Sequence, residues 1–269
     1  MGDDESLICF NPMKKYLAKV VIPVYRKDLM DLEIRSLNQV CTVLKQYPIV
    51  VVKPETLNLS CLTETYPNLF FESFDDSYFA NIQEYNRLML SNEFYSRFLD
   101  SDYMLIYQLD AFVFRDELSF WCSKGYDYIG APWLNNPVNN RPVISAINYL
   151  SFRYSQFRHK KSRQSLFNKV GNGGFSLRKT ESFYKATNVY SSKATEYMQQ
   201  KRSHLYNEDV FWATEIPEFS YPDAMEALRF SFDTCPRHSF RLTNGQLPFG
   251  CHGWYARKMK RFWKPIIGF

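Results

Sequence analysis

Residues 103–114 read Tyr103-Met-Leu-Ile-Tyr-Gln-Leu-Asp-Ala-Phe-Val-Phe114, and this stretch decides the fold class. It is one apolar run, interrupted at Gln108 and Asp110 and bounded on both sides by polar residues. A run of this kind is typical of a strand that is buried on both faces of an α/β sheet. We therefore predict a central strand here, with the other strands arranged around it.

The carboxylate of Asp110 is the unusual feature of this predicted strand. Burying an unpaired charge is costly, so we expect Asp110 either at the strand's end, facing a crevice, or beside a cation. Ligands of open α/β sheets bind at the carboxyl ends of the strands, which makes a metal-bound phosphate one hypothesis. An aspartate that caps a turn is the alternative, and the stretch alone favours neither.

The segments around the central strand predict further α/β units. Residues 19–25 form a β-branched strand with Pro23 near its end, residues 28–46 have helical spacing, and residues 49–52 form a second buried strand. The same periodicities predict strands at 69–71 and 126–133, helices at 82–99, 117–123 and 180–188, and a helix that begins at Glu208 and Asp209.

Length and composition predict a single domain. The chain has 269 residues, 45% of them hydrophobic, which is enough for one large α/β core. No repeat or linker interrupts it. We divide the chain into an N-terminal extension (1–18), one α/β domain (19–254) that contains a long loop or lid insertion (135–169), and a basic, aromatic tail (255–269).

Positive charge is concentrated in two segments. The formal net charge is +5, yet residues 152–169 contain six Lys or Arg and no acid, and residues 257–264 contain five and no acid. Such clusters indicate binding to phosphate groups, whether these belong to a membrane, a nucleotide or a nucleic acid. A solvated loop and tail are the alternative.

The lack of a recognisable targeting signal and the spacing of the cysteines predict a cytoplasmic location. None of the six cysteines forms a Cys-x-x-Cys pair, so we expect reduced core thiols and no zinc ribbon. The first residues lack the layout of a signal peptide, and no apolar run approaches the ~20 residues that span a bilayer. We expect a cytoplasmic protein.

Four features that are distant in sequence could together form a metal–diphosphate site: Asp110, the glycine-rich turn 171–174, the adjacent acids Glu208 and Asp209, and His252. A hard divalent cation prefers carboxylate oxygen, tolerates imidazole and retains phosphate oxygens. A second carboxylate could accept the proton of an attacking hydroxyl. Each feature also has a structural interpretation: acids that favour a helix dipole, a glycine hairpin, and a core histidine.

The order of these motifs resembles the nucleotide-sugar glycosyltransferases of the GT-A class, in particular the β-1,4-galactosyltransferase group. Four segments are similar to motifs of that group: Tyr85-Asn86-Arg87 to Phe-Asn-Arg, Gln108-Leu109-Asp110 to Asp-Val-Asp, Gly173-Gly174-Phe175-Ser176 to Gly-Gly-Val-Ser, and Asn207-Glu208-Asp209-Val210-Phe211 to its Glu-Asp motif. Residues 19–255 also resemble an uncharacterised bacterial GT-A-like family of capsule and lipopolysaccharide loci.

The resemblance implies a single GT-A (Rossmann-like) domain with a mixed, mostly parallel central sheet flanked by helices. It implies transfer of a hexose from a nucleotide sugar, most simply a UDP-sugar, to a surface glycan or lipid-linked glycan, with Mn²⁺ or Mg²⁺ on the diphosphate. The implied roles are as follows: Asp110 and His252 bind the metal, Asp209 is the general base, Glu208 orients hydroxyl groups, Pro23 and Tyr25 border the nucleobase, Arg87 pairs with phosphate, and Gly173 and Gly174 admit the sugar.

Some alternatives stay open within this resemblance. A base placed for in-line attack implies inversion at the anomeric carbon, although retaining members place acids in similar regions. Gln108 replaces the first acid of the Asp-x-Asp motif, so a Lys or Arg from the basic loop could take the place of the metal cation. The main alternative to an enzyme is a non-catalytic carbohydrate- or nucleotide-binding module.

Membrane contact and nucleic-acid binding are the two remaining hypotheses. Residues 152–169 and the tail, which places Trp and Phe among cations, predict contact with the inner face of a membrane. Basic clusters beside aromatic residues also occur in single-stranded nucleic-acid binders. The sequence contains no RNA-binding signature, so we expect no nucleic-acid partner.

Overall fold

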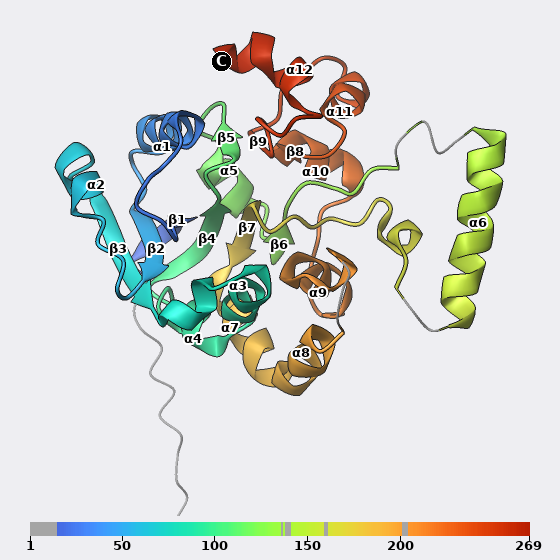
Figure 1. The fold of residues 1–269 in the computed structure, drawn as a ribbon, viewed down its shortest axis with the longest axis horizontal. Coiled ribbons are helices and arrows are strands. Elements are labelled where there is room, and N and C mark those ends of the chain that lie inside the picture. The colour runs from blue at the N-terminus through green and yellow to red at the C-terminus, as the bar shows by residue number, and fades with distance from the viewer. Residues whose placement is uncertain (1–14, 136, 138–140, 159–160, 201–203) are drawn as a thin grey trace, which may run out of the picture.

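The computed structural model describes residues 15–135, 137, 141–158, 161–200 and 204–269, and these form two sheets with helices around them (Figure 1). The central sheet has the strand order β3-β2-β1-β4-β7-β6, and the smaller second sheet has the order β5-β9-β8. Strands β1 to β4 are parallel, whereas β7 and β6 run antiparallel to their neighbours. The strands are β1 Tyr16–Pro23, β2 Ile49–Pro54, β3 Leu69–Phe74, β4 Ser101–Tyr107, β5 Ala111–Val113, β6 Tyr128–Ile129, β7 Phe175–Lys179, β8 Ser231–Phe232 and β9 Gly250–His252.

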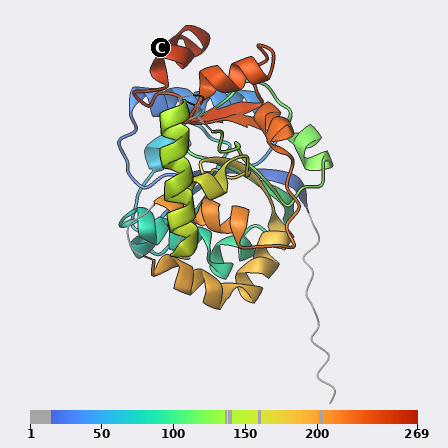
Figure 2. The same ribbon diagram turned by 90° about the vertical axis from the view of Figure 1, so that its right-hand side faces the viewer.

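Helices cover both faces of the central sheet (Figures 1 and 2). The α-helices are α1 Asp31–Val43, α2 Ser60–Thr65, α3 Ile82–Met89, α4 Asn92–Ser96, α5 Leu118–Ser123, α6 Pro142–Phe157, α7 Thr180–Val189, α8 Ser191–Met198, α9 Glu208–Thr214, α10 Ala224–Phe230, α11 Pro236–Leu242 and α12 Lys260–Trp263. Short 3₁₀ turns are η1 Asp76–Phe79, η3 Arg163–Leu166 and η4 His204–Tyr206, and η5 Lys264–Gly268 is a π-helical turn. This architecture confirms the predicted mixed, mostly parallel α/β sheet.

The central strands are apolar on both faces because each face supports a separate core. Alternate residues of a strand point to opposite sides of a sheet. In β4, Leu105 belongs to the same core as Leu37 of α1 on one side, and Met104 belongs to the same core as Trp212 of α9 on the other. Each fully buried aliphatic side chain of this kind contributes ~1.5–3 kcal/mol, so the predicted two-sided burial accounts for the position of β4 inside the sheet.

The predicted strand 103–114 is wrong in one respect, because it is two strands that belong to different sheets. β4 ends at Tyr107, the chain turns over residues 108–110, and β5 joins the second sheet. The turn is closed by the amide of Ala111, which donates to the carbonyl of Gln108 at 2.8 Å. The two polar residues of the apolar run therefore mark the place where the chain leaves the central sheet.

Several predicted boundaries also change. The predicted helix 82–99 is divided into α3 and α4, because the hydroxyl of Ser91 accepts from the amide of Phe94 and starts a new helix. The predicted strand 126–133 contracts to β6, and the first strand begins at Tyr16, inside the predicted N-terminal extension. Residues 1–14 of that extension lie outside the described part of the chain.

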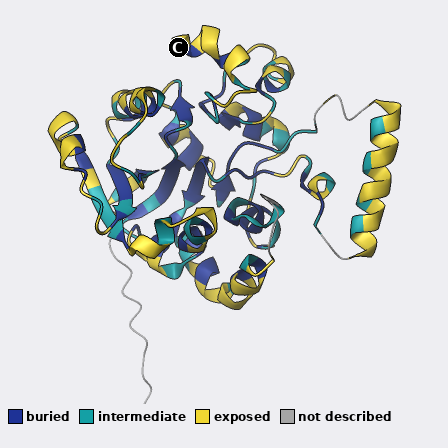
Figure 3. Ribbon diagram, in the orientation of Figure 1, coloured by how far each residue is buried: buried dark blue, intermediate teal, exposed yellow. Residues whose placement is uncertain are grey.

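The insertion and the tail contain more regular structure than the sequence indicates. Residues 135–169 include the helix α6 and the turn η3, which weak periodicity does not predict. In the tail, Trp263 is fully buried, and it packs with Phe232 of the second sheet. Figure 3 shows the contrast between α6, which is exposed or half-buried along its length, and the central strands, which are mostly buried. None of the described helices is long and apolar enough to cross a bilayer.

Candidate functional site

A cavity of about 440 Å³ opens where β1 and β4 end. Its lining includes Pro23, the last residue of β1, and Tyr25 two residues later. It also includes Gln108 and Asp110, which follow β4, and Tyr255 from the tail. Small-molecule sites have volumes of roughly 300–1,000 Å³ and lie at the carboxyl ends of strands in open α/β sheets. The cavity thus lies where the sequence predicts ligand binding.

The second sheet brings Asp110 and His252 together at this cavity. In the pairing of β5 with β9, Ala111 is opposite His252, so the residue before Ala111 adjoins the imidazole. The Oδ1 atom of Asp110 lies 3.1 Å from Nε2 of His252. Nε2 is buried, and it makes no hydrogen bond of good geometry with any described residue. A carboxylate and an imidazole nitrogen therefore face each other without a hydrogen atom well placed between them.

The other ring nitrogen of His252 has polar neighbours as well. Nδ1 lies 3.5 Å from Oδ1 of Asp233 and 3.2 Å from Nδ2 of Asn172. Burial disfavours the charged imidazole, but the carboxylates of Asp110 and Asp233 outweigh burial and raise the pKa of His252 to about 10. The imidazolium in turn lowers the pKa of Asp110, against the effect of burial.

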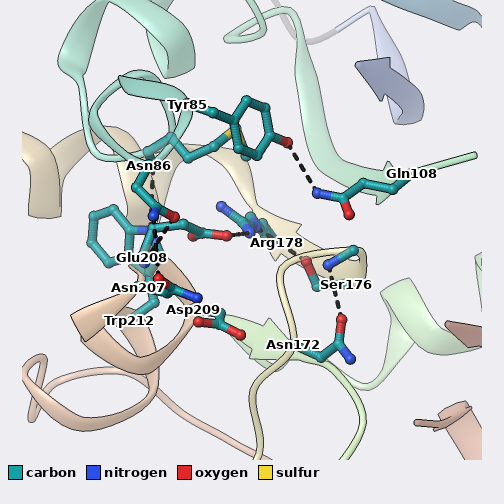
Figure 4. A network of polar contacts seen from close by, with 12 residues as sticks. Tyr85, Asn86, Gln108, Asn172, Ser176, Arg178, Asn207, Glu208, Asp209 and Trp212 are labelled. Carbon is teal, nitrogen blue, oxygen red and sulfur yellow. Dashed lines mark hydrogen bonds and ion pairs between the residues drawn. The ribbon is translucent and has the colours of Figure 1, made fainter. Parts of the chain in front are cut away.

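The acid pair begins helix α9, as predicted, and Glu208 is held by a buried arginine (Figure 4). Nη2 of Arg178 lies 3.0 Å from Oε1 of Glu208. The same guanidinium donates to the hydroxyl groups of Tyr95 at 2.7 Å and Ser176 at 3.2 Å. The second carboxylate oxygen, Oε2, is buried and has no hydrogen-bond partner among the described residues. One oxygen is therefore fixed, while the hydrogen-bonding capacity of the other is unused.

Helix α3 supplies a second support for the acid pair. The side-chain oxygen of Asn86 accepts from the amide of Glu208 at 3.2 Å, and its nitrogen contacts the side chain of Asn207 at 3.4 Å. From the preceding residue of the same helix, the hydroxyl of Tyr85 accepts from the side-chain nitrogen of Gln108 at 3.5 Å (Figure 4). The motif Tyr85-Asn86-Arg87 thus contacts both ends of the site.

Asp209 has the environment of a proton acceptor that works near neutral pH. Burial and the adjacent Glu208 raise the pKa of Asp209 to about 7, while the amides of Val210 and Gly173 oppose the shift. Its Oδ1 accepts from the amide of Val210 at 2.8 Å. A carboxyl group with a pKa of this size is partly ionised at neutral pH and can both accept and return a proton.

The glycine turn separates the acid pair from the imidazole. A Cβ atom on Gly173 would lie 2.2 Å from Oε1 of Glu208, and one on Gly174 would lie 2.1 Å from Nε2 of His252. The side chain of Asn172 shapes the turn, because its Oδ1 accepts from the amide of Gly174 at 2.8 Å. The two glycines are therefore required by the close approach of the Glu208 and His252 side chains, whereas the sequence hypothesis assigns their space to a sugar.

The predicted site residues do not all reach the cavity. Pro23, Tyr25 and Asp110 line it, and His252 contacts Asp110. Arg87 does not line it: its guanidinium is mostly exposed and pairs with Glu84 at 2.8 Å. The acids Glu208 and Asp209 lie beside Gly173, on the other side of the glycine turn from His252.

Sequence reasoning missed four residues that organise the site. Three are polar side chains in its network, and the fourth is a buried cation: Asn86, Asn172, Asp233 and Arg178. A signal for the cation was present, because Arg178 shares one face of the apolar strand β7 with Ser176 and needs a buried acid as partner. No comparable pattern marks Asn172, whose positive φ of 92° becomes visible only in the structure.

Comparisons with known proteins place the chain in one family. A family model described as "Protein of unknown function (DUF5672)" matches residues 68–252. That match includes Asp110, the glycine turn, the acid pair and His252. No curated protein matches the chain.

Solved structures share the fold at low sequence identity. The galactosyltransferase LgtC, in complex with donor and acceptor sugar analogs, is 14% identical over 93% of both chains, with a TM-score of 0.59. An active-site mutant of LgtC is 16% identical over 87% of this chain and 86% of its own, with a TM-score of 0.55. The apo-form glycosyltransferase GlyE of Streptococcus pneumoniae TIGR4 is 9% identical over 87% of this chain and 54% of its own, with a TM-score of 0.50. These similarities confirm the predicted GT-A fold class.

Proposed function

The chain belongs to the DUF5672 family, and for this member we propose a glycosyltransferase that moves a hexose from a nucleotide sugar to a glycan. One observation carries the proposal. A cavity at the ends of β1 and β4 contains Asp110, which faces His252, and the glycine turn beside this pair also contacts an acid whose pKa is near neutrality. These are the groups that diphosphate departure and hydroxyl activation require.

The cavity is the proposed donor site. Tyr25 and Tyr255 supply aromatic surface for a nucleobase, and Pro23 borders it, as the sequence resemblance implies. A UDP-sugar is the proposed donor. Arg87 could reach phosphate only by leaving Glu84. Arg26 lines the cavity directly and is the better placed guanidinium, although it pairs with Glu33 at 2.6 Å.

Asp110 and His252 fit a divalent cation as a two-residue site. The residues that the structure describes include no cluster of three or more potential metal-binding side chains. The facing oxygen and nitrogen, with Nε2 lacking a hydrogen bond, provide one hard and one borderline ligand. Mn²⁺ or Mg²⁺ bound there would neutralise charge on the diphosphate, whose oxygens would complete its coordination.

The chain's own residues would handle the proton and the hydroxyl groups. Asp209, ionised in part at neutral pH, would accept the proton of the acceptor hydroxyl. The unpartnered Oε2 of Glu208 would accept a hydrogen bond from a sugar hydroxyl, while Arg178 fixes the other oxygen. Direct attack by the activated hydroxyl would invert the anomeric carbon, and this stereochemistry is part of the proposal.

The acceptor is the least defined substrate. The resemblance to capsule and lipopolysaccharide families supports a surface glycan carried on a lipid. Such an acceptor would be met in the cytoplasm at the inner membrane face. The buried tail residue Trp263 is not available for this contact, so it would depend on another surface.

A non-catalytic sugar- or nucleotide-binding module is the second candidate. Gln108 supports it, because an amide has replaced a metal-binding acid, and this amide contacts the hydroxyl of Tyr85. An ion pair between Asp110 and a charged His252 would also leave no place for a cation.

Donor turnover distinguishes the two candidates. The protein is incubated with Mn²⁺ and a panel of nucleotide sugars, and donor binding and hydrolysis are measured for the wild type, Asp110→Ala and Asp209→Asn. A transferase predicts that Asp209→Asn still binds donor but loses turnover. A binding module predicts binding without turnover in the wild type as well, and absence of donor binding in the wild type would contradict both candidates.

A further inference from the structure

Helix α6 stands apart from the rest of the fold. It lies to one side of the central sheet in Figure 1 and in front of the remaining fold in Figure 2. None of its residues, Pro142–Phe157, is buried. The half-buried positions Ile144, Asn148, Phe152 and Ser155 share one face at helical spacing, so the remaining faces are open to solvent.

The exposed side of α6 has an unusually apolar stripe. It consists of residues at alternating spacings of four and three, each more than half exposed: Val143 at 72%, Ile147 at 61%, Leu150 at 66%, Tyr154 at 67% and Phe157 at 80%. At 3.6 residues per turn these positions fall on one line along the helix. A contiguous apolar surface of this kind on a soluble domain indicates an interaction site.

Arginines border this stripe. Arg153 and Arg158 are exposed and lie on its two sides by helical spacing. Neither has a carboxylate within ion-pair distance among the described residues. Over a longer stretch, the sequence contains no Asp or Glu from residue 128 to residue 180. The helix therefore combines an apolar face with flanking arginines, on a segment that contains no acid of its own.

We propose that α6 is an interfacial helix that binds the chain to an anionic lipid surface. Apolar side chains would enter the boundary of the acyl chains, and the flanking arginines would contact lipid phosphates. A second copy of the chain is a poorer occupant, because pairing two such helices would bring their arginines together without any acid to separate them. This surface is distinct from the candidate active site, and the inference does not depend on the proposed reaction.

The attachment of α6 relates the lipid surface to the glycine turn. Both ends of the insertion return to the body as a bridged pair, in which Pro132 pairs with Val170 and the amide of Trp133 donates to the carbonyl of Lys169 at 3.0 Å. The next residues in the chain are the glycine turn, which contacts Glu208 and His252. A lipid-bound α6 would therefore hold the candidate site close to the lipid surface.

Vesicle flotation of the full chain tests the proposal without any donor or acceptor. The protein is mixed with phosphatidylcholine vesicles or with vesicles that also contain phosphatidylglycerol, and the floated fraction is measured at low and high salt. We expect binding to the anionic vesicles alone, weakened by salt. Ile147→Ser/Leu150→Ser should abolish flotation, and each of Arg153→Gln and Arg158→Gln should weaken partitioning about fivefold.

Matched variants keep the test specific. Phe70→Ser/Val189→Ser removes two exposed apolar residues elsewhere, and Arg257→Gln/Lys258→Gln removes two cations from the tail; both should float as the wild type does. Thermal melting verifies that every variant is folded. The proposal is overturned if the wild type does not bind anionic vesicles, if the α6 variants bind as well as it does, or if sedimentation shows that α6 forms a dimer which those variants dissociate.

Discussion

Arg178 of β7 and Glu208 of α9 form an ion pair that is closed to water, with Nη2 and Oε1 3.0 Å apart and side-chain exposures of 0% and 4%. The pair joins the antiparallel part of the central sheet to the helix that carries the candidate base. Burial raises the pKa of Glu208, and the charge and hydrogen bond of Arg178 oppose that shift by favouring the ionised carboxylate.

Arg178→Met should destabilise the fold by about 3–5 kcal/mol, because it leaves a buried carboxylate without its partner. Chemical denaturation measures the loss. Adding Glu208→Gln to Arg178→Met should recover part of it. The matched control is Lys185→Met, which removes an exposed partner of Glu181 and should cost less than about 0.5 kcal/mol. Equal effects of the two single substitutions would contradict a structural role for the buried pair.

Asp209→Asn should reduce turnover by about 10²–10⁴-fold, the usual contribution of a general base. In the wild type, kcat/KM should rise as the pH passes through about 7, because only the ionised carboxylate accepts a proton. Initial rates of donor turnover across a pH series check both statements. If Asp209→Asn keeps the increase of kcat/KM near pH 7, then a group other than Asp209 accepts the proton.

The raised pKa of Asp209 also predicts how stability depends on pH. The folded chain binds this proton more tightly than the unfolded chain does, so the associated stabilisation is complete below the unfolded pKa of about 4 and disappears as the pH rises through about 7. Asp209→Asn cannot ionise and should be the more stable protein at about pH 8, by at most a few kcal/mol.

Urea unfolding of the wild type and Asp209→Asn at several pH values measures this difference. The difference in unfolding free energy between the two proteins should decrease towards acidic pH. Asp223→Asn, at the exposed cap of α10, controls for the loss of one carboxylate. Stability curves for the wild type and Asp209→Asn that stay parallel from acid to base would refute the prediction.

Gly174→Ala should damage the candidate metal site more than the fold. The new Cβ would lie 2.1 Å from Nε2 of His252, so the imidazole must move away from Asp110. We expect a stability loss of about 1–3 kcal/mol and a loss of Mn²⁺-dependent donor binding, measured by calorimetry. Gly125→Ala is the control: its Cβ meets nothing within 4 Å, and its cost comes only from a φ of +77°. Unchanged donor binding in Gly174→Ala would exclude the imidazole from the site.

Trp263→Ala should destabilise the protein by about 3–5 kcal/mol, because the tail packs into the core of the second sheet. Thermal and urea denaturation measure the effect. Arg261→Ala, two residues earlier and exposed, should change stability by less than about 0.5 kcal/mol. A tail that serves only as an external anchor would tolerate both substitutions.

The sequence predicts those parts of the fold that depend on local pattern. The strands β1, β2 and β4 follow from apolar runs, and the β-α-β unit follows from the helical spacing between the first two. Asp110, the acid pair and His252 could be singled out because polar residues stand out against apolar or glycine-rich surroundings.

Other features depend on tertiary contacts and could not be predicted. β5 is too short to be recognised as a separate strand, and its role depends on pairing with β9 far along the chain. The sequence predicts Arg87 as a phosphate ligand because a guanidinium suits phosphate. The orientation of α3 instead directs Asn86 into the network and leaves Arg87 exposed. The apolar stripe of α6 is not evident from the sequence, because the apolar residues Ile144, Tyr149 and Phe152 lie on other faces of the same helix and weaken its period.

The pairing of β5 with β9 has a consequence for synthesis on the ribosome. Until the ribosome has synthesised the chain as far as His252, β9 is missing, and β5, which follows Asp110, has no strand to pair with. Assembly of the second sheet therefore creates the carboxylate–imidazole pair only after most of the polypeptide has been made, and incomplete translation products lack this pair.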